Sequence, residues 1–285
     1  MKSYILKLFI CAFFLSSGIV SVSAVRYHCG ADSLKVRELL DAAATGDTYG
    51  RKIVEAARYL KGTPLGKPAD NDSIGTLVIR LDTLSRPEFL NVCIAAAKAM
   101  TYPTGNLRDF EKALEEISRQ KGVDEGFVSQ FRYGSDWIID NISRGNLKEM
   151  TDYLDGGSFR TKTLDYVSRH PEEYPAMADS AVRERVRILE MGYRSHRIPH
   201  QKKQSIGNKN LRELLNDGDI IMMLSPDTDT DVYDAGFVVM KDNQPYLIHI
   251  FTQTDEVVED EYPLPRLFKI EGQFFYGYRW LRPTE

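Results

Sequence analysis

The chain has 285 residues, with 37 lysine and arginine residues against 41 aspartate and glutamate residues, so its formal net charge is −4. This acidic balance argues against nucleic acid as a partner. The length suits one sizeable domain or two small ones, and no repeat, linker or low-complexity tract divides the sequence.

The first 24 residues predict an export signal. Lys2 and Lys7 form a short basic start, an apolar run covers residues 5–20, and small residues end the segment at Ala24. This order predicts cleavage after Ala24 and one domain over residues 25–285, in the periplasm or outside the cell. The alternative is a membrane anchor, but the apolar run is shorter than the roughly 20 residues of a spanning helix. No later segment is apolar enough to span a membrane.

The first half of the remaining chain is helical in pattern. Residues 34–44 and 52–60 carry apolar side chains at helical spacing, and the glycines and proline of residues 62–66 end the second helix. Residues 85–100 predict the best-defined helix, because Ser85 and Glu88 form a capping box before an apolar run. A short strand is expected at 76–81, and further helical or irregular segments at 110–119, 137–142, 165–174 and 181–192.

The second half changes to strand-like patterns. Short apolar runs predict strands at 219–224, 235–240, 246–251 and 274–281, and the polar residues 241–244 predict a hairpin turn. Helices first and an antiparallel sheet second are typical of the α+β class.

The cysteines and histidines predict no metal or other cofactor. Cys11 leaves with the signal, and neither Cys29 nor Cys93 belongs to a pattern with zinc-ligand spacing. Cys93 lies inside an apolar helix, which favours a buried free thiol, although a Cys29–Cys93 disulfide stays open.

Two further polar segments are interpreted as surface structure. The acidic residues 227–231 lack the glycine and glutamate of a calcium-binding EF-hand loop, so a solvated loop is expected. His196 and His200 lie in a basic stretch over residues 194–203, which is interpreted as an exposed connection.

Six segments together resemble one family of bacterial cell-wall enzymes. The most specific is Y-G-S-D-W-I-I-D-N at residues 133–141, which is similar to the family pattern H-Y-x-S-D-W-I-x-D-N with Arg132 in place of the histidine. The others are A-R-Y-L-K-G-T-P at 57–64, R-L-D-T-L-S-R-P-E-F at 80–89, G-D-I-I at 218–221, D-V-Y-D-A-G at 231–236 and Y-L-I-H at 246–249. In this order they resemble the N-acetylmuramoyl-L-alanine amidase-like cysteine hydrolases, of the NlpC-type branch of the papain-like superfamily.

The resemblance implies a papain-like core, with an antiparallel sheet against the helix that begins at Ser85, and additional helices. It places the nucleophilic cysteine at Arg86, the general base at Asp234 and a further histidine at His249. A guanidinium has no nucleophilic form near neutral pH, so no catalytic residue is expected. We expect Arg86 to reach across the former active-site cleft and pair with Asp234.

Three alternatives retain a nucleophile. Ser85 with Asp234 and His249 imitates a serine triad, but the capping role explains Ser85 more simply. Cys93 lies two helical turns after Arg86, which places it under the apolar surface. Cys29 lies just after the expected cleavage site, in a segment expected to be mobile.

The cleft also suggests a binding function. In the relatives, the region of Tyr133, Asp136 and Trp137 borders the substrate cleft, so these residues are candidates for binding a sugar or peptide, with core packing as the alternative.

Three functions remain open at this stage. The first is a non-catalytic relative that binds peptidoglycan fragments or an envelope protein. The second is an active amidase that cleaves the bond between N-acetylmuramic acid and L-alanine with a rearranged site. The third is an envelope protein whose interaction surface lies elsewhere.

Overall fold

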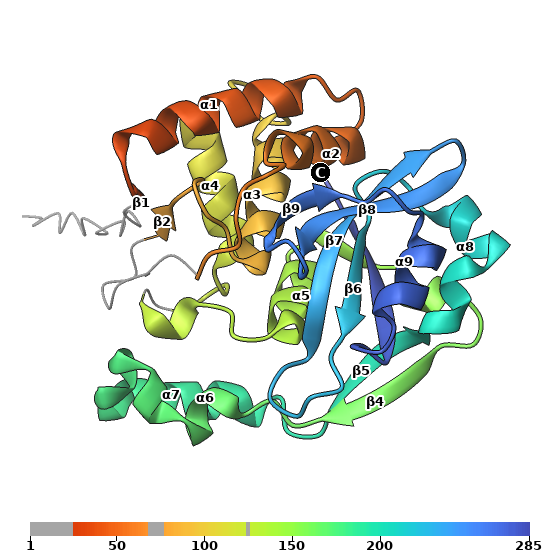
Figure 1. Ribbon diagram of the computed structural model, residues 1–285. Helices are drawn as coiled ribbons and strands as arrows, with labels where there is room; N and C mark the ends of the chain where they lie inside the picture. The colour runs from red at the N-terminus through yellow and green to blue at the C-terminus, as the bar shows by residue number, and fades with distance from the viewer. Residues whose placement is uncertain (1–24, 68–76, 124–125) are drawn as a thin grey trace, which may run out of the picture.

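The computed structural model describes residues 25–67, 77–123 and 126–285 (Figure 1). The expected export signal over residues 1–24 lies outside these ranges. None of the helices within them combines the length and the hydropathy needed to cross a bilayer.

A twisted antiparallel sheet forms the centre of the molecule (Figure 1). Within the described residues it has eight strands, and β3 pairs with one end of β10 outside the main path. In spatial order the other strands are β4 (Ser158–Lys162), β5 (His196–Lys202), β10 (Gly277–Pro283), β6 (Ile220–Leu224), β7 (Val232–Lys241), β8 (Gln244–Phe251) and β9 (Glu256–Glu259), with β3 at Leu147–Glu149. The predicted α+β class is therefore confirmed.

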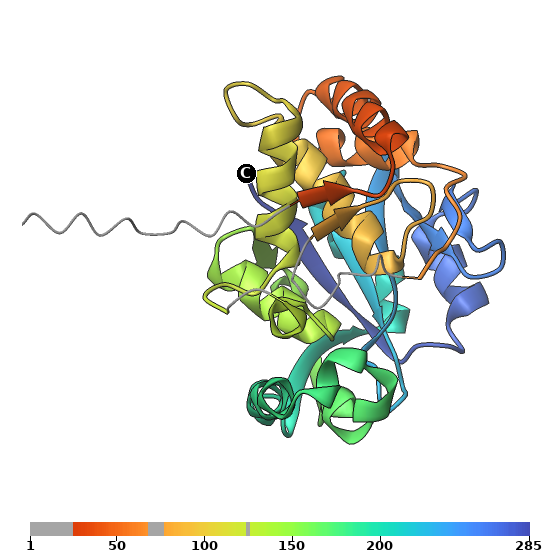
Figure 2. The same cartoon turned by 90° about the vertical axis from the view of Figure 1, so that its left-hand side faces the viewer.

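Helices cover both faces of the sheet (Figures 1 and 2). One face packs against α1 (Gly30–Ala44), α2 (Tyr49–Tyr59), α3 (Arg86–Ala99), α4 (Leu107–Ser118) and α5 (Gly134–Ser143). The other face packs against α8 (Lys209–Leu214) and α9 (Leu264–Glu271). The remaining elements are the parallel pair β1 (Val25–Tyr27) and β2 (Leu77–Ile79), helices α6 (Tyr166–Arg169) and α7 (Ser180–Met191), and 3-10 turns at Phe127–Ser129, Thr151–Tyr153, Pro171–Glu173, Pro175–Ala178 and Lys203–Gly207.

Strand β6 shows how one sequence run serves both cores. Its side chains alternate between the two faces of the sheet. Ile220 and Met222 join the core under α3, whereas Ile221 and Met223 join the core under α9. Because both faces are covered, an uninterrupted apolar run replaces the usual alternation of apolar and polar residues.

Helix α3 lies at the middle of the first core. It is buried on all sides from Phe89 to Ala99, as expected for a helix with apolar residues around its whole circumference. The predicted capping box is present, since the Ser85 backbone N–H donates to Glu88 Oε2 at 2.8 Å and the Glu88 N–H donates to Ser85 Oγ at 3.4 Å. This cap fixes the position of Arg86, the first residue of the helix.

The predicted hairpin between β7 and β8 is also confirmed. Lys241 pairs with Gln244, and the two residues between them, Asp242 and Asn243, both adopt positive φ angles of 48° and 61°. This is the backbone of a two-residue type I′ turn, which matches the twist of the flanking strands.

The interpretation of residues 194–203 as an exposed connection is wrong. Most of this segment is strand β5, which lies between β4 and β10. His200 is buried, with its ring edge-on to Tyr276 at a centroid distance of 4.9 Å. The basic composition did not indicate a strand, because the long lysine and arginine side chains of a strand can keep their charged ends in water.

Candidate functional site

A cleft of about 580 Å³ opens where the N-terminal ends of α3 and α5 meet strand β7. Arg86 lines it from α3, Tyr133 and Trp137 from the start of α5, and Tyr233 and Asp234 from β7. The cleft therefore brings together the segments that the resemblance places around the family's active site.

Arg86 and Asp234 form an ion pair across this cleft. Arg86 Nε donates to Asp234 Oδ1 at 3.1 Å, and Arg86 Nη2 donates to Thr252 Oγ1 at 3.2 Å. The Asp234 side chain is only 3% exposed, and its Oδ1 also accepts a hydrogen bond from the Ala235 backbone N–H at 2.8 Å. The expected pairing of Arg86 with Asp234 is confirmed.

His249 lies behind Asp234 and is almost completely buried. Its Nδ1 is 2.6 Å from Asp234 Oδ2, and its Nε2 is 3.5 Å from Asp260 Oδ2. Burial favours the neutral imidazole, but the two carboxylates outweigh this effect and raise the pKa of His249 to about 10. With its pKa raised this far, the imidazole is protonated at neutral pH and has no lone pair with which to accept a proton, and its Nε2 forms no hydrogen bond within the described residues.

Gly236 makes room for this histidine. It pairs with His249 in the β7–β8 register. A Cβ atom at position 236 would lie 2.6 Å from His249 Cβ and 2.6 Å from the carbonyl oxygen of Ile248. The glycine two residues after Asp234 thus allows the close contact between β7 and β8 that brings the histidine to the aspartate.

Ser85 is held in the helix cap. Its hydroxyl donates to Glu88 Oε2 at 2.7 Å. The ring nitrogens of His249 face Asp234 and Asp260. The structure therefore does not assemble the serine triad considered for Ser85.

Neither Cys29 nor Cys93 lines the cleft, and both are free thiols. Cys93 is fully buried in α3, as predicted, and burial raises the pKa of its thiol well above the ordinary value. Cys29 is exposed at the start of α1, where its Sγ lies 3.1 Å from Asp32 Oδ2. The structure therefore brings neither thiol to the place of a nucleophile.

Tyr133 and Trp137 form one wall of the cleft but are mostly buried. The Tyr133 hydroxyl donates to Glu190 Oε1 at 2.7 Å, and Trp137 Nε1 donates to Asn91 Oδ1 at 3.0 Å. The polar ends of both side chains are thus occupied by the protein, and only parts of the rings border the cleft.

Two buried carboxylates hold the start of α5. Asp136 accepts hydrogen bonds from the backbone N–H groups of Arg132 and Tyr133, and Asp231 accepts hydrogen bonds from the first two N–H groups of the helix. Burial raises the pKa of Asp136 to about 7, although these backbone hydrogen bonds act in the opposite direction. Asp136 does not line the cleft and orients the helix that carries Trp137.

A lysine ammonium, rather than a metal site, organises the acidic loop over residues 227–231. Lys162 Nζ donates to the carbonyl oxygens of Ser225 at 2.6 Å, Thr230 at 2.7 Å and Asp227. The Lys162 ammonium group therefore satisfies three carbonyl oxygens of the segment over residues 225–230.

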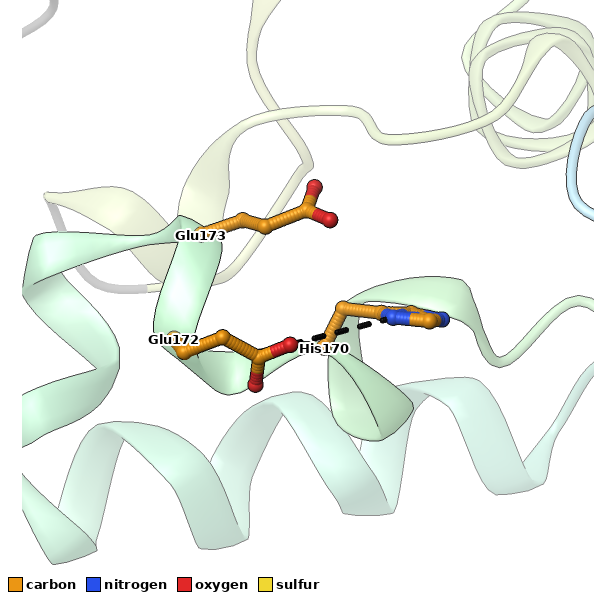
Figure 3. Close-up of side chains that lie close together, drawn as sticks. All are labelled: His170, Glu172 and Glu173. Carbon is orange, nitrogen blue, oxygen red and sulfur yellow. Dashed lines mark ion pairs between the residues drawn. The ribbon is translucent and has the colours of Figure 1, made fainter.

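One group in the described part of the chain has the residue types of a metal site. His170, Glu172 and Glu173 follow helix α6, and their potential ligand atoms lie within 4.8 Å of one another (Figure 3). His170 Nδ1 is 4.0 Å from Glu172 Oε1, and the Glu173 carboxylate accepts a hydrogen bond from the Tyr166 hydroxyl. Zinc bonds of about 2 Å require donor atoms about 3.5 Å apart, so these side chains would have to move to bind a metal.

The sequence model of a family described as N-acetylmuramoyl-L-alanine amidase-like, or AmiA-like, matches residues 55–269. The chain belongs to this amidase-like family. The matched region contains Arg86, Asp234 and His249. No curated protein matches the chain in sequence.

Solved structures agree with the amidase-like fold. An N-acetylmuramoyl-L-alanine amidase from Bacteroides uniformis is 21% identical with a TM-score of 0.71, over 82% of this chain and 99% of that one. A putative xylanase from Bacteroides fragilis is 23% identical with a TM-score of 0.68, over 79% and 98%. A Legionella pneumophila protein is 16% identical with a TM-score of 0.69, over 90% and 95%. At these identities the likeness concerns the fold.

Sequence reasoning missed two residues of this amidase-like site. Thr252 follows β8 directly, and Asp260 follows β9. Their positions depend on the β8–β9 register, which pairs Val258 with His249. No local pattern in the sequence reveals that register.

Proposed function

We propose that the protein is a non-catalytic member of the amidase-like family with an NlpC-type, papain-like core, and that it binds peptidoglycan fragments in the Arg86 cleft. One observation carries the proposal. The position that the resemblance gives to the nucleophile holds a guanidinium, and this guanidinium is paired with the residue at the position of the general base.

The electrostatics of the pair support a binding role. A cysteine hydrolase needs a thiolate and a neutral base that accepts a proton. Here Asp234 is hydrogen-bonded to Arg86 and His249, and the pKa of His249 is raised to about 10. Arg86, Asp234 and His249 thus form a row of side chains with alternating charges, which stabilises the cleft. None of these three groups can transfer a proton at neutral pH.

The open volume of the cleft supports a ligand. With Arg86 as one of its walls, the cleft encloses about 580 Å³ between α3, α5 and β7. This volume lies within the range of cavities that bind small molecules. The structurally similar Bacteroides uniformis proteins are N-acetylmuramoyl-L-alanine amidases, so the fragments of amide hydrolysis are the ligands we propose.

The test uses the purified chain of residues 25–285. We expect no release of peptide from muropeptides, measured by mass spectrometry, and saturable binding of the same muropeptides, measured by titration calorimetry. Turnover that survives the double substitution Cys29→Ala and Cys93→Ala would show an active enzyme with a rearranged site. Absence of both turnover and binding would move the function to a surface outside the cleft.

We also propose that the protein is exported, on the basis of the basic start, apolar run and small residues of the first 24 positions. Expression of the full chain in a bacterial host tests this. The expected result is a periplasmic or secreted product whose N-terminal residue is Val25. An uncleaved, membrane-bound product would identify the segment as an anchor.

A further inference from the structure

The protein uses only part of the hydrogen-bonding capacity of the Arg86 guanidinium. Nε donates to Asp234 and Nη2 donates to Thr252, so both contacts involve one edge of the planar group. In the ranges that the structure describes, no acceptor contacts Nη1. The Arg86 side chain lines the cleft and is 25% exposed. The edge that contains Nη1 is therefore left for a ligand.

The carboxylates of the cleft do not compete for this edge. The charged residues that line the cleft are Arg80, Arg86, Arg119 and Arg132 with Glu88, Asp231 and Asp234. Each of these three carboxylates already accepts hydrogen bonds from the protein: Glu88 in the cap of α3, Asp231 at the start of α5, and Asp234 from Arg86. Asp234 is also shared with the cationic His249, so it neutralises Arg86 only in part.

An aromatic surface lies beside the guanidinium. Tyr233 lines the cleft next to Asp234, and its ring stacks on Phe274 with centroids 5.6 Å apart and planes at 13°. Phe274 is exposed. Aromatic faces of this kind suit the apolar face of a sugar ring or an aliphatic side chain. The expected ligand therefore carries an anionic group next to a less polar surface.

Amide hydrolysis creates such an anion. The reaction converts R–CO–NH–R′ and water into R–COO⁻ and ⁺H₃N–R′. A guanidinium binds a carboxylate through two parallel charge-assisted hydrogen bonds, whereas an intact amide offers one neutral oxygen. The resemblance gives position 86 to the nucleophile that attacks the amide carbonyl, so we expect the new carboxylate to lie beside Arg86.

Resting on the proposed function, we propose that Arg86 makes the cleft specific for cleaved peptidoglycan, that is, for fragments that carry a free carboxylate where the amide bond has been hydrolysed. The protein would thus recognise the product of its enzymatic relatives rather than their substrate. Two sources share this chemistry: the lactyl carboxylate of N-acetylmuramic acid and a terminal carboxylate of the stem peptide.

The experiment compares each acid with its neutral amide by titration calorimetry on residues 25–285. The probes are N-acetylmuramic acid with its methylamide, and N-acetyl-L-alanyl-D-glutamate with its diamide. We expect the acid of one pair to bind at least about tenfold more tightly than its amide, since only the acid forms charge-assisted hydrogen bonds with the guanidinium. The pair that shows the preference identifies the source.

Variants assign the preference to Arg86. Arg86→Gln is expected to abolish the preference for the acid, and Arg86→Lys to retain part of it, because lysine keeps the charge but loses the planar fork. Arg187→Gln on the exposed face of α7 is the matched control and should leave the preference unchanged. Thermal melting confirms that each variant is folded, and the Lys variant keeps the test valid if the Gln variant is not.

The outcomes separate this proposal from the proposed function. Equal binding of acid and amide, or a preference that persists in Arg86→Gln, would overturn the carboxylate specificity and leave a fragment-binding cleft. If neither the probes nor larger muropeptides bind, the proposed function itself fails.

Discussion

Arg86 and Asp234 join helix α3 to strand β7, with Arg86 Nε 3.1 Å from Asp234 Oδ1. A carboxylate that is 3% exposed is costly to ionise without a cation beside it. Asp234 has two such partners, Arg86 on the side of the cleft and His249 on the side of the core. The pair therefore has a structural role as well as a place in the cleft.

This relationship predicts thermodynamic coupling. Arg86→Gln should lower the free energy of unfolding by about 2 kcal/mol, because Asp234 keeps His249 but loses a charged donor. In a double-mutant cycle with Asp234→Asn, the interaction energy should be about 1 kcal/mol or more. Urea unfolding followed by tryptophan fluorescence measures both quantities.

The cycle has a control on α7. Arg187 and Glu184 form an exposed pair three residues apart, and this pair should show no measurable coupling. Additive effects of Arg86→Gln and Asp234→Asn, within about 0.4 kcal/mol, would mean that the observed contact does not stabilise the fold.

The protonation state of His249 gives a second prediction. Its pKa in the folded chain is about 10, above the ordinary histidine value of about 6.5. Its contribution to stability should therefore be complete below about pH 6.5 and should be lost as the pH rises through about 10. Nitrogen chemical shifts, assigned by comparison with His249→Gln, should show an imidazolium from pH 6 to 9.

His196 and His200 provide the internal comparison for this titration. Burial lowers the pKa of both residues below the ordinary histidine value, so each should lose its proton at a much lower pH than His249 does. If His249 titrated between pH 5 and 7, a neutral base would be present in the site, and the argument against catalysis would lose its electrostatic support.

Local chemistry explains which parts of the fold could be predicted from the sequence. The start of α3 is encoded by Ser85 and Glu88, which contact each other three residues apart. The β7–β8 turn is encoded by Asp242 and Asn243, which tolerate positive φ angles. By contrast, β5 is a strand because β4 and β10 flank it, and its own polar sequence does not show this.

The residues of the site also differ in whether the sequence could locate them. Arg86, Asp234 and His249 could be located because they fall within recognisable segments. Asp260 could not, because its approach to His249 depends on the pairing of β8 with β9. The polar ends of Tyr133 and Trp137 bind buried groups contributed by α7 and α3, so the sequence could not reveal how little of each ring faces the cleft.

Lys162 gives a third prediction. Its ammonium group donates to three backbone carbonyls of the segment that contains the acidic loop. Lys162→Met should leave these carbonyls without a donor and lower the free energy of unfolding by about 2–4 kcal/mol. Lys209→Met, on the exposed face of α8, is the matched control and should have little effect.

Calcium chloride should not raise the melting temperature of the unmodified protein, and a calcium-dependent increase would instead indicate a metal site in the loop.

The last prediction concerns reconstruction of the nucleophile. In a Cys29→Ala background, Arg86→Cys places a thiol at the start of α3, but its neighbour is the carboxylate of Asp234, which disfavours a thiolate. Arg86→Cys with Asp234→His replaces that carboxylate by an imidazole, which stabilises a thiolate as an ion pair. Alkylation by iodoacetamide at pH 6.5 should therefore be faster for the double replacement than for Arg86→Cys alone.

Release of L-alanyl peptide from muropeptides should likewise appear only with both replacements, because a thiol and a base must be present together. Equal alkylation rates for the two variants would show that Asp234 does not control the chemistry at position 86, and the arginine alone would then account for the loss of a nucleophile.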